Sequence, residues 1–325
     1  MLDQPGKPLL NSHFAGSIQE TREDHVPRFG LCCLFAQEPI KFRSFTMKSL
    51  VQLGTTERLS KISDVCLHNS RSLLQALHFC RANGIGAFRV MSPFLPRYTH
   101  PDAGYTIDTL PDGEEISRNL ALVRKFRDTH DIRLSFHPDQ FIVLSSPRRD
   151  VVDNAVRELD YQAMLAELIG ADVINVHGGG HYGDPTLALS RFADNFRRLP
   201  ERVQSRLALE NDDKIYSVVD LLPLCRQLGI PLIYDVHHHR CNNDGLSEEE
   251  ATRRTIQTWE HVGREPYFHL SSPRNGWRHA NPLPHADYID LADFPPCWHG
   301  LTGTIDVEAK AKELAVIALQ QALAG

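Results

Sequence analysis

The sequence has no apolar run long enough to span a bilayer, so we expect no membrane role. Its N-terminus lacks the successive charged, apolar and small-residue regions of a secretory signal. The seven cysteines are scattered, odd in number and without a CxxC pair, which argues against a disulfide framework and a thiolate zinc site. These absences fit the reducing cytoplasm, where we expect the protein to act as a monomer.

The chain also lacks an excess of basic residues. Its formal net charge is −6, whereas nucleic-acid binding usually leaves a basic footprint. Bound divalent cations would reverse this charge locally, because a bound ion is often the largest charge in its site. The 17 histidines are many for a chain of 325 residues, and they direct attention to metal binding.

No GxGxxG motif follows the first predicted strand, which disfavours the structural alternative, a doubly wound open sheet. No internal repeat or linker divides the chain. Short apolar runs, several rich in β-branched residues, alternate with longer amphipathic stretches. The apolar runs predict strands at 29–34, 87–91, 133–137, 172–177, 206–210, 231–236, 267–271 and 303–307. The amphipathic stretches predict helices at 58–82, 114–129, 150–168, 186–199, 218–228, 248–261 and 307–324.

Strands that alternate with helices in this way are typical of an α/β fold of the (β/α)8 TIM-barrel type. The composition, 42% hydrophobic and 23% charged, is sufficient for a sizeable core. We therefore expect residues 28–325 to form one barrel domain and residues 1–27 to be a polar, unstructured lead-in.

Metal-ligand residue types fall at the ends of six consecutive predicted strands. They are His137, His177, Glu210, Asp235 (followed by the run His237-His238-His239), His269 and Glu308. The carboxyl ends of barrel strands converge on one rim, where active sites are built. Imidazole and carboxylate together suit zinc or manganese, and clustered metals activate water and stabilise charge on a phosphate.

Each of these residues has a simpler explanation when taken alone. A single histidine at a strand end is more often a hydrogen-bonded core or rim residue than a ligand. The run from His237 to His239 could be a solvated loop, with at most two of the three facing metals. Glu308 begins a helical pattern and could simply favour the positive end of that helix. The joint occurrence at six successive strands favours a metal centre over these separate explanations.

The chain resembles the UV damage endonucleases of the UvdE/UvsE type, which are relatives of the endonuclease IV abasic-site enzymes. The resemblance extends over nearly the whole chain from Arg28 onward. The first half of its motifs are Arg28-Phe-Gly30, Lys41-Phe-Arg43-Ser-Phe-Thr46, Phe88-Arg89-Val-Met-Ser92 and His137-Pro-Asp-Gln140-Phe141. The second half are Asn175-Val-His177-Gly-Gly-Gly, Leu209-Glu210-Asn211-Asp212, Asp235-Val-His237-His238, His269-Leu-Ser-Ser272, His285-Ala-Asp-Tyr-Ile289 and Glu308-Ala-Lys310-Ala-Lys312-Glu313.

The resemblance implies up to three divalent metal ions, Mn²⁺ or Zn²⁺, in a complete ligand set. One ion would lie among His137, His177 and Glu210, and a second among Glu210, Asp235, His269 and Glu308. A third would take His238 and His285, with Asp235 nearby. His285 is added by the resemblance alone, whereas the Asp-x-x-His spacing of Asp235 and His238 also favours His238 over its neighbours.

The resemblance further implies a substrate, damaged double-stranded DNA, and a reaction, hydrolysis of the phosphodiester 5′ to a UV photoproduct or another lesion. Gln140 and Phe141 match the pair that probes damaged bases in the family. Glu210 and Glu308 are the candidate catalytic residues, which would orient or deprotonate the attacking water. Three further residues are candidates for phosphate contact, although each could equally be a structural ion-pair partner: Arg43, Arg89 and Lys310.

Five positions depart from the family's usual pattern. Leu31 and Phe141 stand where tyrosine is common, and Asp139 stands where glycine is common. Tyr267 stands where a lysine is common, and Asp306 where a hydrophobic residue is usual. The metal-ligand set is thus complete, while the set expected to face DNA is altered.

Two other functions fit parts of the pattern. A sugar isomerase or epimerase uses a similar barrel with histidine and carboxylate ligands, but typically needs fewer metals and no basic groove. A non-catalytic lesion-binding protein is disfavoured, because every expected ligand is present. A broad positive groove at the rim would favour DNA, and a small closed pocket would favour a sugar.

Overall fold

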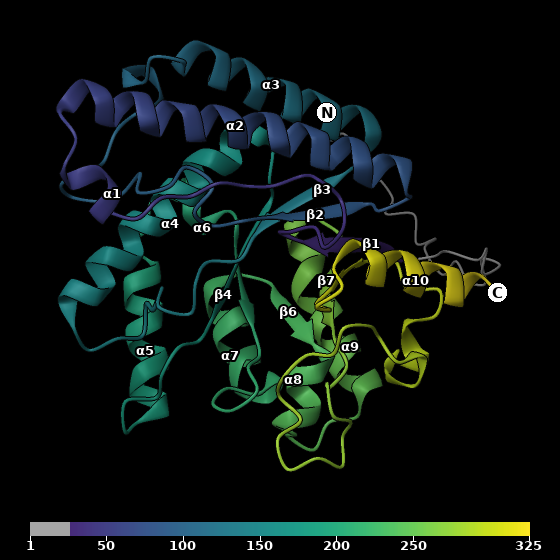
Figure 1. The fold of residues 1–325 in the computed structure, drawn as a ribbon. Coiled ribbons are helices and arrows are strands. Elements are labelled where there is room, and N and C mark those ends of the chain that lie inside the picture. The colour runs from purple at the N-terminus through teal and green to yellow at the C-terminus, as the bar shows by residue number, and fades with distance from the viewer. Residues whose placement is uncertain (1–26) are drawn as a thin grey trace, which may run out of the picture.

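A computed structural model describes residues 27–325, so nearly all of the predicted lead-in, residues 1–26, lies outside the described residues. Eight parallel strands pair in chain order, and the last pairs with the first to close a barrel. This closed barrel, with helices between its strands, confirms the predicted (β/α)8 architecture (Figure 1). The strands are β1 (Arg28–Cys32), β2 (Ala87–Val90), β3 (Arg133–Phe136), β4 (Val173–His177), β5 (Leu207–Glu210), β6 (Leu232–Asp235), β7 (Tyr267–Leu270) and β8 (Thr304–Val307).

The helices surround the barrel, with α2 and α3 packed side by side along one flank (Figure 1). The α-helices are α1 (Lys48–Val51), α2 (Thr55–Ala82), α3 (Gly113–His130), α4 (Arg149–Ile169), α5 (Pro185–Phe196), α6 (Glu201–Gln204), α7 (Val218–Leu228), α8 (Val236–Cys241), α9 (Glu248–Trp259) and α10 (Glu313–Ala324). Short 3-10 helices are η1 (Ile107–Thr109), η2 (Glu260–Val262), η3 (Leu291–Asp293) and η4 (Pro296–Trp298). None of the helices between residues 27 and 325 combines the length and apolar composition that a bilayer span requires.

One local prediction and one alternative explanation are wrong. The last helix begins at Glu313 rather than at residue 307, because the backbone N–H of Glu308 donates to the carbonyl of Leu270 and extends the pairing with β7 (2.9 Å). Lys312, with φ of 53°, makes the turn into α10. The run His237–His239 is not a loop but part of the short helix α8, which starts directly after β6.

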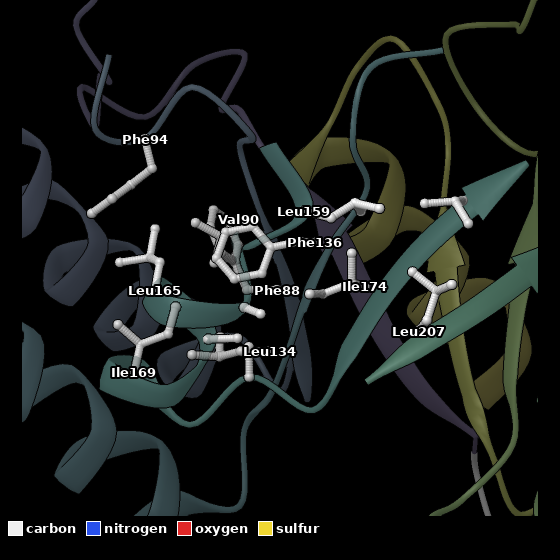
Figure 2. Close-up of a cluster of buried hydrophobic side chains, with 14 of the residues drawn as sticks. Phe88, Val90, Phe94, Leu134, Phe136, Leu159, Leu165, Ile169, Ile174 and Leu207 are labelled. Carbon is white, nitrogen blue, oxygen red and sulfur yellow. The ribbon is translucent and has the colours of Figure 1, made fainter. Parts of the chain in front are cut away.

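The barrel strands alternate between an outer apolar face and an inner face that carries most of the polar residues. Outward side chains of β2 and β3 pack against α4 (Figure 2). They are Phe88, Val90, Leu134 and Phe136 on the strands, with Leu159, Leu165 and Ile169 on the helix. Because successive strand residues point to opposite faces, Arg89 and Ser135 point into the barrel between these apolar neighbours. The apolar outer face of the strands thus packs against the helices and stabilises the fold, and the polar inner face carries the candidate functional residues.

Candidate metal centre

Glu210 ends β5 and lies at the middle of a buried cluster of histidines. Its side chain is 1% exposed, and its two carboxylate oxygens face different histidine pairs. Oε2 lies 3.0 Å from His137 Nε2 and 3.8 Å from His177 Nε2. Oε1 lies 3.0 Å from His269 Nδ1 and 3.3 Å from His238 Nδ1. A carboxylate whose two oxygens face different histidine pairs is suited to bridging two cations.

Two further carboxylates complete the cluster from neighbouring strands. Asp235 Oδ2, at the end of β6, lies 3.6 Å from His238 Nδ1 and 3.8 Å from His269 Nδ1. Glu308 Oε1, just after β8, lies 3.4 Å from His269 Nδ1. Three groups of residues offer ligand atoms that all lie within 4.8 Å of one another. These groups are His137–His177–Glu210, Glu210–Asp235–His238 and Asp235–His269–Glu308.

Two asparagines that belong to the family motifs hold the ligands in place, although no role was predicted for either. Asn175 donates a hydrogen bond from its amide to Oε2 of Glu210. Asn211 accepts from the backbone N–H of Asp235 (3.0 Å) and donates to the carbonyl of Asp235 (2.9 Å), which ties the ends of β5 and β6 together. Asn175 could have been found from its spacing, because it lies two residues before His177 on β4 and shares its face.

The residues of the cluster shift one another's pKa values. Burial alone would raise the pKa of Glu210, but the neighbouring His269 and His177 bring that pKa well below its usual range. Burial lowers the pKa of His177, which favours the neutral imidazole. Burial would also raise the pKa of Glu308, and the adjacent Arg89 and His269 reverse this shift, so that the net pKa is lowered. Burial would lower the pKa of His238 and of His269, but Asp235 raises that of His238 and Glu210 that of His269, so both net shifts are upward. The ionised carboxylates and the neutral imidazole of His177 are protonation states that bind divalent cations, and cation binding at His238 and His269 would release their protons.

Hydrogen bonding among the described residues leaves ligand atoms of the cluster unused. Asp235 Oδ2 and His177 Nδ1 are both buried and have no hydrogen-bond partner in residues 27–325. A buried carboxylate oxygen without a partner is costly unless a cation or water satisfies it. The donor set of imidazole nitrogens and carboxylate oxygens suits zinc or manganese. The residues present therefore fit divalent metal ions.

The third expected ligand set is only partly assembled. His238 lies beside Asp235 and Glu210, whereas His285 lies apart from them, with Nδ1 3.7 Å from Glu308 Oε2. The ring of His285 instead neighbours that of His237, at 5.1 Å between centroids. Of the histidine run, His239 turns away and pairs with Asp244 (3.1 Å).

The residues expected to face DNA divide into an exposed set and a buried exception. Gln140 and Phe141 lie in the loop after β3, where Phe141 is 73% exposed. Arg43 and Lys310 are also exposed. Arg89 is 7% exposed, and its guanidinium contacts Asp306 and Glu308. This placement favours the ion-pair alternative for Arg89 over a phosphate contact.

The closed parallel barrel and the histidine–carboxylate cluster at the carboxyl ends of its strands define a TIM-barrel protein with a candidate metal centre on its catalytic rim. Within this class, the chain belongs to the UV-endonuclease UvdE family, whose sequence model matches residues 27–325. The resemblance found in the sequence is thereby confirmed.

Individual relatives agree with this assignment. The UV DNA damage endonuclease of Bacillus velezensis is 35% identical over 309 residues, which cover 91% of this chain and 93% of the relative. The crystal structure of SacUVDE matches with a TM-score of 0.80 at 29% identity, covering 91% of this chain and 98% of that one. Endonuclease IV from Thermus thermophilus shares the fold, with a TM-score of 0.58 at 14% identity over 92% of this chain and 98% of that one.

Proposed function

We propose that this protein is a DNA repair endonuclease that hydrolyses the phosphodiester 5′ to UV photoproducts and other lesions. Membership of the UvdE family and the similarity to a UV DNA damage endonuclease support this proposal. The observation that carries it is the buried Glu210 carboxylate, whose two oxygens face separate histidine pairs at the catalytic rim. This arrangement matches the demands of phosphodiester hydrolysis, in which negative charge develops on several oxygens at once.

The cluster would hold up to three divalent ions, Mn²⁺ or Zn²⁺. His137, His177 and Glu210 would hold one. A second would be held by Glu210, Asp235, His269 and Glu308, and a third by His238 and His285 with help from Asp235. Bound cations of this kind activate water and stabilise charge on the phosphate oxygens.

Glu210 and Glu308 would have different parts in the reaction. Glu210 is enclosed by histidines, so it would hold cations through both of its carboxylate oxygens. Glu308 is more exposed, at 16% of its side chain, and directs Oε2 toward the loop of His285. Because the pKa of Glu308 is lowered, chiefly by Arg89 against the effect of burial, its carboxylate stays ionised. An ionised, weakly basic carboxylate is better suited to orienting the attacking water than to removing its proton.

Gln140 and Phe141 would enter the DNA helix at the lesion. The side chain of Asp139 accepts a hydrogen bond from the backbone N–H of Phe141 (3.1 Å), which fixes the turn that presents both residues. The Asp139 departure from the family pattern therefore has a local structural role. An exposed phenylalanine ring has the apolar face needed to stack on bases where a lesion already weakens stacking. Arg43 and Lys310, both exposed, would contact the DNA backbone.

The decisive test is incision of duplex oligonucleotides by the manganese-loaded protein. Each duplex carries one cyclobutane dimer, one 6-4 photoproduct or one abasic site, with the damaged strand labelled at its 5′ end. We expect a single labelled product that ends at the nucleotide immediately 5′ to the lesion. We expect no product from undamaged duplex. No incision of any of these substrates would refute the proposal.

The same preparation also tests the alternatives. Turnover of a ketose or aldose without DNA incision would establish a sugar isomerase or epimerase. Tight binding to damaged duplex without incision, in protein shown to contain metal, would establish a lesion-binding protein. Zn²⁺ and Mn²⁺ are compared in parallel, so that lack of the preferred ion is not mistaken for lack of activity.

A further inference from the structure

A polar chain of side chains lies inside the barrel directly beneath the metal centre. Tyr267 on β7 and Asp306 on β8 point inward from neighbouring strands, and the hydroxyl of Tyr267 donates to Oδ1 of Asp306 (2.9 Å). Both are buried, at 1% and 0% exposure. They are also two of the positions where this chain departs from the family's usual pattern. The two departures therefore contact each other and form one unit.

The barrel leaves room for Asp306 at one specific place. Gly30 lies opposite Asp306 in the pairing of β1 with β8. A Cβ atom at Gly30 would lie 2.0 Å from Oδ1 of Asp306, so any larger residue would displace the carboxylate. A fully buried carboxylate needs a counter-charge, because its desolvation is otherwise costly.

Arg89 on β2 supplies that charge and connects Asp306 to the metal centre. Its Nε donates to Oδ2 of Asp306 (2.9 Å), and its Nη2 also lies 2.9 Å from Oδ2. The two terminal nitrogens of the guanidinium also reach two predicted ligands. Nη1 donates to Oε1 of Glu308 (2.6 Å), and Nη2 donates to Nε2 of His269 (2.8 Å). One guanidinium thus joins the buried Asp306 to a ligand group.

We propose that Asp306, supported by Tyr267, is a positioning residue that sets the cation affinity of the Asp235–His269–Glu308 group through Arg89. The inference rests on the proposed metal centre. Asp306 anchors the guanidinium from below and neutralises its charge, so that Arg89 orients Glu308 and His269 without cancelling the negative charge that a divalent cation requires. Without the Asp306 charge, Arg89 pairs with Glu308 alone and repels a cation from the same group.

The test uses the full-length protein and the substitutions Asp306→Asn and Tyr267→Phe. Binding of Mn²⁺ is measured by equilibrium dialysis, and incision of a dimer-containing duplex gives kcat and KM. For Asp306→Asn we expect about tenfold weaker binding of one Mn²⁺ and a matching loss of kcat, as is usual when a residue that orients a ligand is changed. KM for DNA stays unchanged because Asp306 is buried beneath the centre. For Tyr267→Phe we expect about a threefold effect in the same direction. Its hydroxyl bonds with both Asp306 and Ser135, but Asp306 loses only one hydrogen bond and keeps its contacts with Arg89.

Thr304→Val is the matched control. Thr304 is buried two residues earlier on β8, bonds with Glu265 and Arg133 at the opposite end of the barrel, and contacts no predicted ligand. We expect it to lower stability and leave Mn²⁺ affinity unchanged. If the folded Asp306→Asn variant has the Mn²⁺ affinity and kcat of the wild type, this inference is overturned while the proposed function stands. If that variant does not fold, wild-type behaviour of Tyr267→Phe overturns it. A wild-type protein that neither binds Mn²⁺ nor incises DNA would overturn the proposed function as well.

Discussion

The two ends of the barrel both carry buried charges, but they balance them differently. At the amino-terminal end of the strands, three arginines have an anion within ion-pair distance. Arg28 pairs with Asp131 (2.8 Å) and with Glu265 (2.7 Å), and Arg133 pairs with Asp172 (3.0 Å). Arg264 lies near Asp172 as well, at 3.9 Å. The ion pairs of these arginines serve stability.

The carboxyl end has an excess of anions. Among the described residues, the carboxylates of Glu210, Asp235, Glu308 and Asp306 gather here, and the guanidinium of Arg89 pairs with two of them, Asp306 and Glu308. Asp235 Oδ2 has no hydrogen-bond partner at all within the described part of the chain. The comparison shows that unbalanced buried charge, more than buried charge itself, distinguishes a candidate cation site from a structural ion-pair network.

The largest expected effect comes from Glu210→Ala at the carboxyl end. Without the carboxylate that faces four histidines, we expect the protein to bind at most one cation. We expect kcat to fall by more than about 100-fold, because this loss exceeds the one typical of residues that only orient a ligand. Metal content by elemental analysis and incision of a dimer-containing duplex measure the two effects. Retention of both metal and activity would remove Glu210 from its bridging role.

At the amino-terminal end, Glu265→Gln should act on stability instead. Glu265 accepts from Nε of Arg28 (2.7 Å) and from the hydroxyl of Thr304. We expect the free energy of unfolding, measured in urea, to fall by about 2 kcal/mol, as for a lost hydrogen bond to a charged group. Incision per folded molecule should equal that of the wild type. An equal loss of activity would erase the distinction between the two ends.

Phe141→Ala sharpens the comparison at the outer edge of the catalytic rim. Loss of an exposed ring that stacks on bases should raise KM for damaged duplex about tenfold, since such stacking is worth about 1–3 kcal/mol. Metal content should not change, because Phe141 lies outside the ligand cluster. Leu122→Ala is the matched control, since Leu122 is an exposed apolar residue on α3, at 49% exposure. Equal KM values for both variants would exclude Phe141 from DNA binding.

Glu313→Gln should have the smallest effect, and that effect depends on pH. Glu313 is an acid near the rim that is fully satisfied, since it accepts from the backbone N–H groups of Ala36 (2.6 Å), Gln37 (2.7 Å) and Glu38 (3.2 Å). Burial raises the pKa of Glu313, but these donors lower it more, so the net shift is downward.

A folded pKa below the unfolded value of about 4.3 gives stability that is present above that value and is lost as pH falls through the folded pKa. We therefore expect wild type to exceed Glu313→Gln by about 1 kcal/mol at pH 7, with the difference shrinking below about pH 4. Chemical denaturation across this pH range measures it. A difference that does not vary with pH would show that hydrogen bonding to a neutral group accounts for the effect.

Much of the fold was predictable because its signals are local. Every observed strand lies within two residues of its predicted bounds, since a run such as Val173-Ile-Asn-Val-His177 specifies a buried strand by itself. The start of α10 was missed for a non-local reason. The helical pattern around Glu308 is real, but the N–H of Glu308 bonds with Leu270 on the neighbouring strand, and that pairing delays the helix.

The sequence by itself determined the order of strands along the chain and which strand ends carry histidine or carboxylate. The periodicity of apolar residues shows which side chains share a face of a strand, and the carboxyl ends of all barrel strands lie on one rim. Only the tertiary structure decided which ligands meet. It brought His238 to Glu210, left His285 beside Glu308 and His237, and buried Arg89 between Asp306 and Glu308. Arg89 and Asp306 are 217 residues apart, and their contact exists only because β1, with Gly30 facing Asp306, lies between β8 and β2 in the closed barrel.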